Sequence, residues 1–292
     1  SSGDTLDVQQ LVSGDRLDVE AVGTLTVADA SVTGDASING QSDVVLGQAT
    51  IGQTLTVNAA TELTAFTLEV VGNSNLTSGS DLSVTTFNGQ GDLVANAGGD
   101  LVLDNGTVGG NATLSSVGRA TIDTLSAQGK LDVTSGAALA ARVLSSEAAM
   151  TLSSGDTLDV QQLVSGDRLE VGAVGTLSLA ESAVTGDATL NGQSDVVLGQ
   201  ATVGQTLTVN AVTDLTATTL AVTGNSLLTS GADLSVATFD GQGDLVANAG
   251  GDLSLGNGTV GGSATLSSVG ETTIDTLSTQ GTLDVSSGAA LA

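Results

Sequence analysis

The chain repeats itself at two lengths, and this repetition is the feature that most constrains its fold. The opening run SSGDTLDVQQLVSGDRL recurs unchanged from Ser153, so that the copies are offset by 153 − 1 = 152 positions. A shorter 19-residue period lies inside each copy, and 8 × 19 = 152. Short periods of about 20 residues upward are typical of solenoids. The 19-residue period therefore predicts one coil of a parallel β-helix.

Four apolar columns recur with this shorter period, starting at Leu6, Val8, Leu17 and Val19. A spacing of two places both apolar side chains on one face of a strand. The polar residues that interrupt these columns are Ser74, Ser226 and Thr272. A looser third apolar set contains Leu68, Phe87, Leu125, Leu144, Leu163, Leu220, Phe239 and Leu277. We therefore expect an all-β solenoid of about 15 coils with three short strands per coil, and the crossover rule favours a right-handed coil.

Two further columns are expected at the bends between strands. The glycine column contains Gly34, Gly72, Gly91, Gly110, Gly129, Gly186, Gly224, Gly243, Gly262 and Gly281. Glycine would supply a positive φ at tight bends. The polar column contains Asn39, Asn58, Thr77, Asn96, Ser115, Thr134, Ser153, Asn191, Asn210, Thr229, Asn248 and Ser267. Its amides and hydroxyls are expected either to form hydrogen-bonded ladders along the stack or only to suit turns.

The same periodicity predicts one continuous rod over residues 1–292. The first super-repeat copy covers residues 1–152 and the second covers residues 153–292, with no linker, because Met150 and Leu152 keep the core phase at the junction. About fifteen coils at ~4.8 Å each would give a rod of roughly 70 Å. The chain lacks a recognisable signal peptide and does not begin with Met, so we expect an internal segment of a longer protein whose coils continue on both sides.

Composition excludes several classes of partner. The formal net charge is −27, so binding to nucleic acid or to anionic lipid is disfavoured. No apolar run approaches the ~18 residues of a membrane span, and we expect no membrane insertion. Proline is absent, which suits a chain whose amides donate to the next coil. Cysteine is also absent, so the chain has no disulfide framework.

Acidic residues gather in one column of the repeat. Its members are Asp43, Glu62, Asp81, Asp100, Asp195, Asp214, Asp233, Asp252 and Glu271. Carboxylates stacked one strand spacing apart are expected to raise one another's pKa values. Two interpretations are open: a solvated acidic stripe screened by salt, or a stripe that binds Ca²⁺. The sequence defines no metal site and no other cofactor.

Catalysis is not expected from this composition. The chain has no His and no Cys, which removes nucleophile–base triads and most transition-metal sites. The unbroken period leaves no loop that could build a cleft around paired carboxylates. The serine pairs Ser115–Ser116 and Ser153–Ser154 are expected to be bend residues rather than nucleophiles. We therefore assign no catalytic, cofactor-binding or metal-binding residue.

The coil motif carries a family resemblance over the whole chain. Steps of the form G-x-L-x-V occur in GDRLDV from Gly14, GQTLTV from Gly52 and GKLDV from Gly129, with a related GDLVL from Gly99. This pattern resembles the shaft repeats of filamentous-haemagglutinin-type exoproteins, a family of adhesins and contact-dependent growth inhibition effectors. The resemblance implies an extracellular, surface-attached protein of a Gram-negative bacterium, exported by an outer-membrane transporter through two-partner secretion. It transfers no functional residue to this chain.

These observations predict a structural role. The expected function is that of a stiff shaft segment in a very large secreted fibrous protein, which presents a distal adhesive or effector module to a host or neighbouring cell. Its partners would be adjacent coils of the parent chain. Two alternatives remain: a direct adhesive or matrix module with Ca²⁺-dependent association through the acidic column, and a filament of copies stacked end to end.

Overall fold

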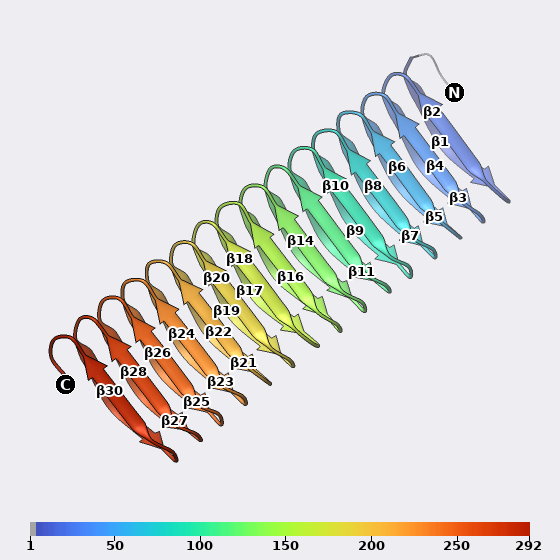
Figure 1. The fold of residues 1–292 in the computed structure, drawn as a ribbon. Coiled ribbons are helices and arrows are strands. Elements are labelled where there is room, and N and C mark those ends of the chain that lie inside the picture. Colours follow the sequence, from blue (N-terminus) through green and yellow to red (C-terminus); the bar gives the residue numbers. More distant parts are fainter. Residues whose placement is uncertain (1–3) are drawn as a thin grey trace. The chain divides into compact units, whose positions relative to one another are not determined.

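The computed structural model describes residues 4–292 and confirms an all-β parallel solenoid of about 15 coils. Over this range the chain forms thirty strands and no helix. Each coil contributes one eight-residue strand and one five-residue strand, which we call the long strand and the short strand (Figure 1). Three-residue turns separate them. The first turn follows the long strand and the second turn follows the short strand.

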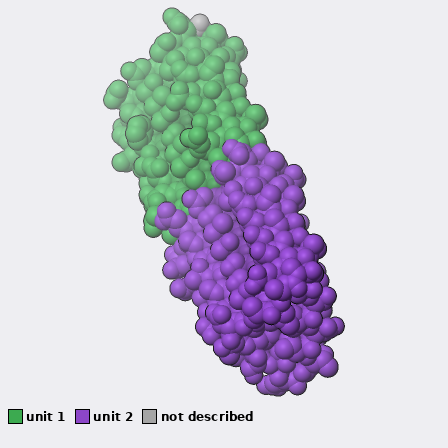
Figure 2. Space-filling model, turned by 90° about the vertical axis from the view of Figure 1, so that its left-hand side faces the viewer, with its two compact units in different colours: residues 1–147 green, residues 148–292 purple. Residues whose placement is uncertain are grey.

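The fold divides into two compact units, which Figure 2 shows in green and purple. Unit 1 is Ser1–Glu147, of which residues 4–147 are described, and unit 2 is Ala148–Ala292. The long strands of unit 1 are β1 (Leu6–Ser13), β3 (Leu25–Val32), β5 (Val44–Ile51), β7 (Leu63–Val70), β9 (Leu82–Gly89), β11 (Leu101–Val108), β13 (Ala120–Ala127) and β15 (Leu139–Ser146). Its short strands are β2 (Leu17–Ala21), β4 (Ala36–Gly40), β6 (Leu55–Ala59), β8 (Ser74–Ser78), β10 (Leu93–Ala97), β12 (Ala112–Ser116) and β14 (Leu131–Ser135).

Unit 2 has the same two kinds of strand. Its long strands are β17 (Leu158–Ser165), β19 (Leu177–Val184), β21 (Val196–Val203), β23 (Leu215–Val222), β25 (Leu234–Gly241), β27 (Leu253–Val260) and β29 (Thr272–Thr279). Its short strands are β16 (Met150–Ser154), β18 (Leu169–Ala173), β20 (Ala188–Gly192), β22 (Leu207–Ala211), β24 (Ser226–Ser230), β26 (Leu245–Ala249), β28 (Ala264–Ser268) and β30 (Leu283–Ser287).

Strand pairing follows the 19-residue period without a slip inside either unit. In unit 1, Leu25 of β3 pairs with Val44 of β5, and Leu55 of β6 pairs with Ser74 of β8, in parallel ladders. In unit 2, Leu215 of β23 pairs with Leu234 of β25 in the same way. Each unit therefore contains one parallel sheet of long strands and one of short strands, with the core between them.

The core consists of stacked aliphatic side chains, as the apolar columns predict. In β5, Val44, Leu46, Ala49 and Ile51 are buried, whereas the two consecutive residues between Leu46 and Ala49 are not. This change of phase bends the long strand, so that both pairs face inward. The expectation of three separate strands per coil is therefore corrected, because the third apolar set lies within the long strand. Leu68 of β7, for example, is fully buried in the second half of its strand.

The glycines act through close packing rather than through a special backbone conformation. No described residue, glycine or other, has a positive φ, so this part of the sequence expectation is wrong. Adjacent coils instead approach each other closely at the first turn. A Cβ built on Gly34 would lie 2.6 Å from the carbonyl oxygen of Asp15 in the preceding coil, and one on Gly72 would lie 2.8 Å from that of Gln53. The lack of a side chain permits this stacking.

Glycines also make room for the two largest core side chains. Phe87 of β9 is only 2 % exposed, and a Cβ on Gly89 of the same strand would lie 2.6 Å from its ring. Gly106 of β11 occupies the position paired with Phe87 in the next coil. Unit 2 repeats this arrangement with Phe239, Gly241 and Gly258. The volume of each phenylalanine ring is thus offset by neighbouring glycines, which keeps the narrow core closely packed.

Two sequence expectations on the whole chain stay predictions. They are the single continuous rod over residues 1–292, together with its length, and the right hand of the coil. Residues 1–3, with which both the rod and the first super-repeat copy begin, lie outside the described residues.

Candidate functional site: turn ladders and outward faces

The acidic column forms a ladder at the second turn, which we call the second-turn ladder. The residues of this ladder precede the long strands, and Oδ1 of each aspartate accepts a hydrogen bond from the backbone N–H of the corresponding residue in the next coil. Asp81 accepts from Asp100 N at 2.8 Å, and Asp100 accepts from Arg119 N at 2.7 Å. In unit 2, Asp233 accepts from Asp252 N at 2.8 Å and Asp252 accepts from Glu271 N at 2.7 Å. The column therefore has a structural role.

The first aspartate of the ladder in each unit has an additional donor. The Thr61 hydroxyl donates to Oδ1 of Asp43, and the Thr213 hydroxyl donates to Oδ1 of Asp195. In unit 2, the Thr213 hydroxyl and the Asp214 backbone N–H hold the pKa of Asp195 below its ordinary value, against a small opposing effect of burial. The expectation that stacking raises the pKa is wrong for Asp195, because donors stabilise its ionised form.

One member of the column does not continue the ladder. Within the described residues, the Glu62 carboxylate accepts no hydrogen bond from Asp81 N–H, and it lies instead 3.5 Å from the Thr64 hydroxyl. The equivalent residue in unit 2 is Asp214, which accepts from Asp233 N at 3.0 Å. The additional methylene of glutamate moves its carboxylate away from the amide. The side-chain length of aspartate is therefore part of the ladder's geometry.

A second ladder of the same kind occupies the first turn, and the sequence analysis missed it. We call it the first-turn ladder. Asn73 accepts from Asp92 N at 2.9 Å, Asp92 accepts from Asn111 N at 2.7 Å, and Asn111 accepts from Lys130 N at 2.9 Å. Unit 2 repeats it, with Asn225 accepting from Asp244 N at 2.9 Å. The available signal was the recurrence of Asp or Asn directly before several short strands, at Asp35, Asn73, Asp92, Asn111, Asp187, Asn225 and Asp244.

The predicted polar ladder is confirmed for one asparagine pair in each unit, and at a different place in the coil. Asn58 Nδ2 donates to Asn39 Oδ1 at 2.8 Å in unit 1, and Asn210 donates to Asn191 at 2.9 Å in unit 2. Asn39 and Asn58 lie near the ends of β4 and β6 rather than at bends, and their side chains point outward. Adjacent amides at one strand spacing can donate and accept in series.

Serines at the ends of the short strands face inward and hold the second turn. The Ser78 hydroxyl donates to the carbonyl of Asp81 at 2.7 Å, and the Ser135 hydroxyl donates to that of Ala138 at 3.0 Å. Ser116 behaves similarly, donating to the carbonyl of Gly118 at 3.2 Å. Ser154, the last residue of β16, donates to the carbonyl of Thr157 at 2.8 Å. The buried serines therefore hold the turns through hydrogen bonds. The expectation that Ser115–Ser116 and Ser153–Ser154 are bend residues is corrected, because all four lie within β12 and β16 and, of these, Ser116 and Ser154 bond to the turn.

The polar residues that interrupt the core columns differ from one another. Thr272 is fully buried and its hydroxyl lies 2.8 Å from that of Ser268. Ser74 and Ser226 are 2 % exposed, and among the described residues their hydroxyls have no hydrogen-bond partner. They occupy equivalent places in the two super-repeat copies, because 226 − 74 = 152. An unpaired buried hydroxyl costs about 1–3 kcal/mol, so each marks a weak coil.

Few cations balance the surface charge. The ion pairs within residues 4–292 are Arg16–Asp18 at 3.3 Å, Arg168–Glu170 at 2.9 Å, and Arg142–Asp123, whose Nη2–Oδ2 distance is 3.1 Å. All six side chains are about half-exposed or more. The Arg142 guanidinium lowers the pKa of Asp123 by hydrogen bonding and by charge. Exposed pairs of this kind contribute little to stability.

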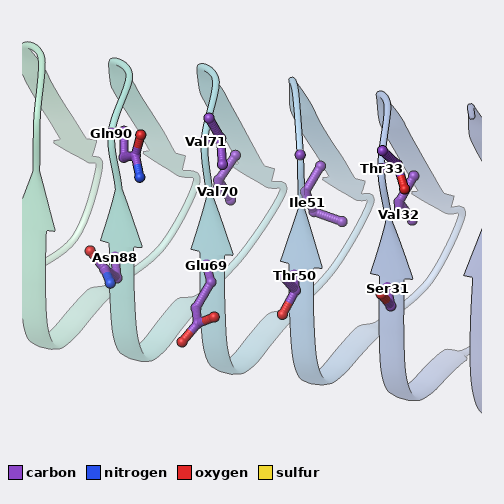
Figure 3. A pocket seen from close by; sticks show the side chains of 11 residues that line it. Ser31, Val32, Thr33, Thr50, Ile51, Glu69, Val70, Val71, Asn88 and Gln90 are labelled. Carbon is purple, nitrogen blue, oxygen red and sulfur yellow. The ribbon is translucent and has the colours of Figure 1, made fainter. Parts of the chain in front are cut away.

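Each unit has a shallow groove that runs across the C-terminal ends of its long strands and the first turns that follow them. The groove in unit 1 has a volume of ≈ 390 Å³ and is lined by one row containing Thr50, Glu69 and Asn88 and another containing Val71 and Gln90. Figure 3 shows these rows, with one residue of each row per coil. The groove in unit 2 has a volume of ≈ 490 Å³, and Asp240 is its acidic residue. Each groove has a single carboxylate, so neither pairs an acid with a base.

The described residues form turn ladders, outward faces and two shallow grooves. Residues 4–292 contain no group of three or more His, Cys, Asp or Glu arranged to hold a metal ion. In the part of the chain that the structure covers, no helix has the length and apolar character needed to cross a membrane. Each ladder aspartate uses Oδ1 to accept from a backbone amide. This arrangement fixes the register between adjacent coils. It also leaves regular outward faces on both sheets.

In comparison with known proteins, no protein-family model matches the chain, and no curated protein and no solved structure is significantly similar to it.

Proposed function

We propose that this chain is a shaft segment of a large secreted fibrous surface protein of the filamentous-haemagglutinin type, in which it acts as a stiff spacer. The observation that carries the proposal is that both units keep the 19-residue register in every coil, with no inserted loop. A catalytic solenoid needs a cleft, and the grooves here are shallow. An uninterrupted coil is what a spacer needs.

The ladders support the mechanical part of the proposal. Within each unit, every coil is tied to the next by two parallel β-ladders, and most are tied also by an aspartate or asparagine at one or both turns. In a repeat protein, stability is a sum of such neighbour terms. Bending a coil stack would stretch the turn contacts on one side, so additional contacts at both turns increase stiffness.

Secretion, cell-surface attachment and export through an outer-membrane transporter belong to the same proposal. They rest on the resemblance of the G-x-L-x-V coil to the exoprotein shaft. The absence of Cys and the strong negative charge are compatible with export and solubility outside the cell. Exposure of the parent protein on intact cells to an added protease, followed by detection of this segment, would test the localisation independently of the shape.

Small-angle X-ray scattering of the chain tests the spacer function. A stiff spacer of about fifteen coils at ~4.8 Å per coil predicts a maximum dimension of roughly 70 Å plus side chains, with a rod-like scattering profile. The same profile is expected with EDTA and with millimolar Ca²⁺. A maximum dimension near half that value, which would mean that the two units fold back on each other, would contradict the spacer function. A change of shape with Ca²⁺ would favour the calcium-dependent adhesive alternative.

A further inference from the structure

One surface of each unit carries no charge, although the chain has 32 acidic residues. It is the outward side of five consecutive short strands, β4, β6, β8, β10 and β12 in unit 1 and β20, β22, β24, β26 and β28 in unit 2. The unit 1 strands read ASING, LTVNA, SNLTS, LVANA and ATLSS, and those of unit 2 are almost the same. Their outward side chains are Ser, Thr, Asn, Val or Leu. We call these two surfaces the neutral faces.

Strands with outward carboxylates flank each neutral face at both of its ends along the stack. In unit 1, β2 carries Asp18 and Glu20 on one side, and β14 carries Asp132 on the other. In unit 2, β18 carries Glu170 and β30 carries Asp284. The long-strand sheet lacks such a surface, because at most two consecutive long strands in either unit are without a charged residue. Each neutral face is therefore a bounded feature that both super-repeat copies contain.

The side chains of the neutral faces stand in a regular array. Outward residues of one strand lie two positions apart, and each lies next to its counterpart in the following coil, as Thr56 does next to Asn75 and Asn58 next to Thr77. Five strands at ~4.8 Å and five residues at ~3.3 Å give an area of about 400 Å² for one face. A face of this size corresponds to a small interface, at the low end of the areas that specific protein contacts bury.

We propose that the neutral faces are the surfaces through which two copies of this chain associate side by side. Charge favours this choice, since the other long surfaces of two copies carry carboxylates that would repel each other. Periodicity supports it, because two identical arrays of small side chains at one strand spacing can interdigitate, as in paired β-sheets with asparagine ladders. A sugar polymer fits less well, because the chain has no Trp or Tyr for stacking. This proposal concerns a contact between copies and does not depend on the spacer function.

The carboxylates around each neutral face make association of two copies sensitive to ionic strength, which can be varied to test the proposal. The two ladders place Asp residues such as Asp35, Asp92 and Asp81 at the turns on both sides of the unit 1 neutral face. When two copies approach, these edges repel each other at low ionic strength, and the repulsion is screened as salt rises. We therefore expect association to increase with salt, whereas an interface built on ion pairs would weaken.

The experiment is sedimentation equilibrium of the full chain at ionic strengths of about 0.01 M and about 1 M, where the Debye length falls from ~30 Å to ~3 Å. A four-site variant adds charge to both neutral faces: Thr56→Glu, Thr113→Glu, Thr208→Glu and Thr265→Glu. A control variant adds the same charge to the outward side of the long-strand sheet: Thr26→Glu, Thr121→Glu, Thr216→Glu and Thr273→Glu. The two sets are matched in residue type, charge and exposure, with two half-buried and two exposed positions in each.

We expect the wild-type chain and the control variant to form dimers at high salt, and the neutral-face variant to stay monomeric, with an association constant at least about tenfold lower, a change typical of misplaced interface charge. Circular dichroism should show the same β content for all three chains. A monomeric wild-type chain at both ionic strengths would overturn the proposal. So would equal association of the two variants, which would place the contact elsewhere, for example at the coil ends.

Discussion

The two units are nearly the same inside and differ outside. Phe87 and Phe239, each with its pair of glycines, occupy equivalent places, and the unpaired hydroxyl of Ser74 recurs in unit 2 as that of Ser226. Outward residues are less constrained: Glu69 in unit 1 corresponds to Ala221 in unit 2. The comparison shows that the inward positions differ less between the units than the outward ones, because each inward side chain is packed against the neighbouring coils.

The turn residues differ between the two units more than the inward residues and less than the outward ones. Most ladder acceptors are the same in the two units, and Asn111 corresponds to Ser263, but Glu62 replaces the aspartate found as Asp214 in unit 2. The second-turn ladder is therefore continuous from Asp195 to Glu271 in unit 2 and interrupted once in unit 1. If the ladder contributes to coil stacking, the two units should differ in local stability at that coil. The following predictions test this comparison.

The largest effect is expected from Phe87→Ala. Phe87 is 2 % exposed, and its removal leaves a cavity beside Gly89 and Gly106 that the glycines cannot fill. We expect a local loss of about 3–5 kcal/mol, seen as faster amide hydrogen exchange in β7, β9 and β11. Phe239→Ala should produce the same loss in β23, β25 and β27. Unequal losses would show that the two cores are not equivalent.

A smaller effect is expected from removing one rung of the ladder. Asp81→Ala leaves Asp100 N–H without its acceptor at 2.8 Å, and we expect a loss of about 1–2 kcal/mol, typical of a hydrogen bond to a charged group that water can partly replace. Asp81→Asn keeps an acceptor oxygen and should cost less. Hydrogen exchange of Asp100 N–H measures both. Equal costs for the two variants would mean that charge, rather than the hydrogen bond, stabilises the turn.

Ser74→Ala is expected to stabilise the protein. It removes a buried hydroxyl that has no partner within residues 4–292, so we expect a gain of about 1 kcal/mol. Ser78→Ala is the matched control, because the Ser78 hydroxyl donates to the carbonyls of Thr61 and Asp81 and its loss should destabilise. Thermal unfolding of the two variants should therefore shift in opposite directions. A loss of stability in both would mean that the Ser74 hydroxyl has a partner after all.

The unit comparison can be tested by exchanging one residue. Glu62→Asp should restore the missing rung to Asp81 N–H and increase local stability by about 0.5–1 kcal/mol, as for a typical net hydrogen bond. The reverse change, Asp214→Glu, should break the bond to Asp233 N–H at 3.0 Å. Exchange rates of the two amides report the outcome directly. Unchanged rates in both variants would contradict the role given to aspartate length.

The smallest effect concerns pH. The pKa of Asp195 is lowered, chiefly by the Thr213 hydroxyl, so its contribution to stability is present above the ordinary aspartate pKa of about 4 and is lost as pH falls through the lower folded value. Thr213→Val removes the hydroxyl and should raise the pKa of Asp195, seen by carbon-detected NMR titration. The loss of stability in acid should then be smaller and should be complete at a higher pH, because the folded pKa lies closer to the ordinary value. A titration that does not move would show that Asp214 N–H alone sets the shift.

Much of the fold could be predicted because the core columns repeat with a fixed period. Leu17, Leu55 and Leu93 share a phase, and a side chain that recurs once in every coil can only stack on itself. The strand count per coil could not be predicted in the same way, because Leu46 and Ala49 are separated by a bend that keeps both residues inward. The alternation of inward and outward residues is interrupted at that bend. The sequence pattern therefore suggests two strands where the chain forms one.

The candidate sites were harder to predict for a different reason. The acidic column was visible, but its role depends on the distance between Asp81 and the amide of Asp100, which the sequence does not contain. The first-turn ladder was not predicted because Asn73, Asp92 and Asn111 differ in charge. Their side-chain oxygens nevertheless accept the same kind of hydrogen bond from the next coil. The neutral faces become apparent only when outward and inward positions are separated along each short strand.

The central claim is the parallel 19-residue register, and engineered cysteines test it most directly because the natural chain has none. Thr56 pairs with Asn75 in the adjacent short strand, within reach of a disulfide at one strand spacing. We predict that Thr56→Cys with Asn75→Cys forms an intramolecular disulfide on mild oxidation. Thr56→Cys with Thr77→Cys, a diagonal pair, should stay reduced. Cross-linking of the diagonal pair, without cross-linking of the registered one, would contradict the coil described here.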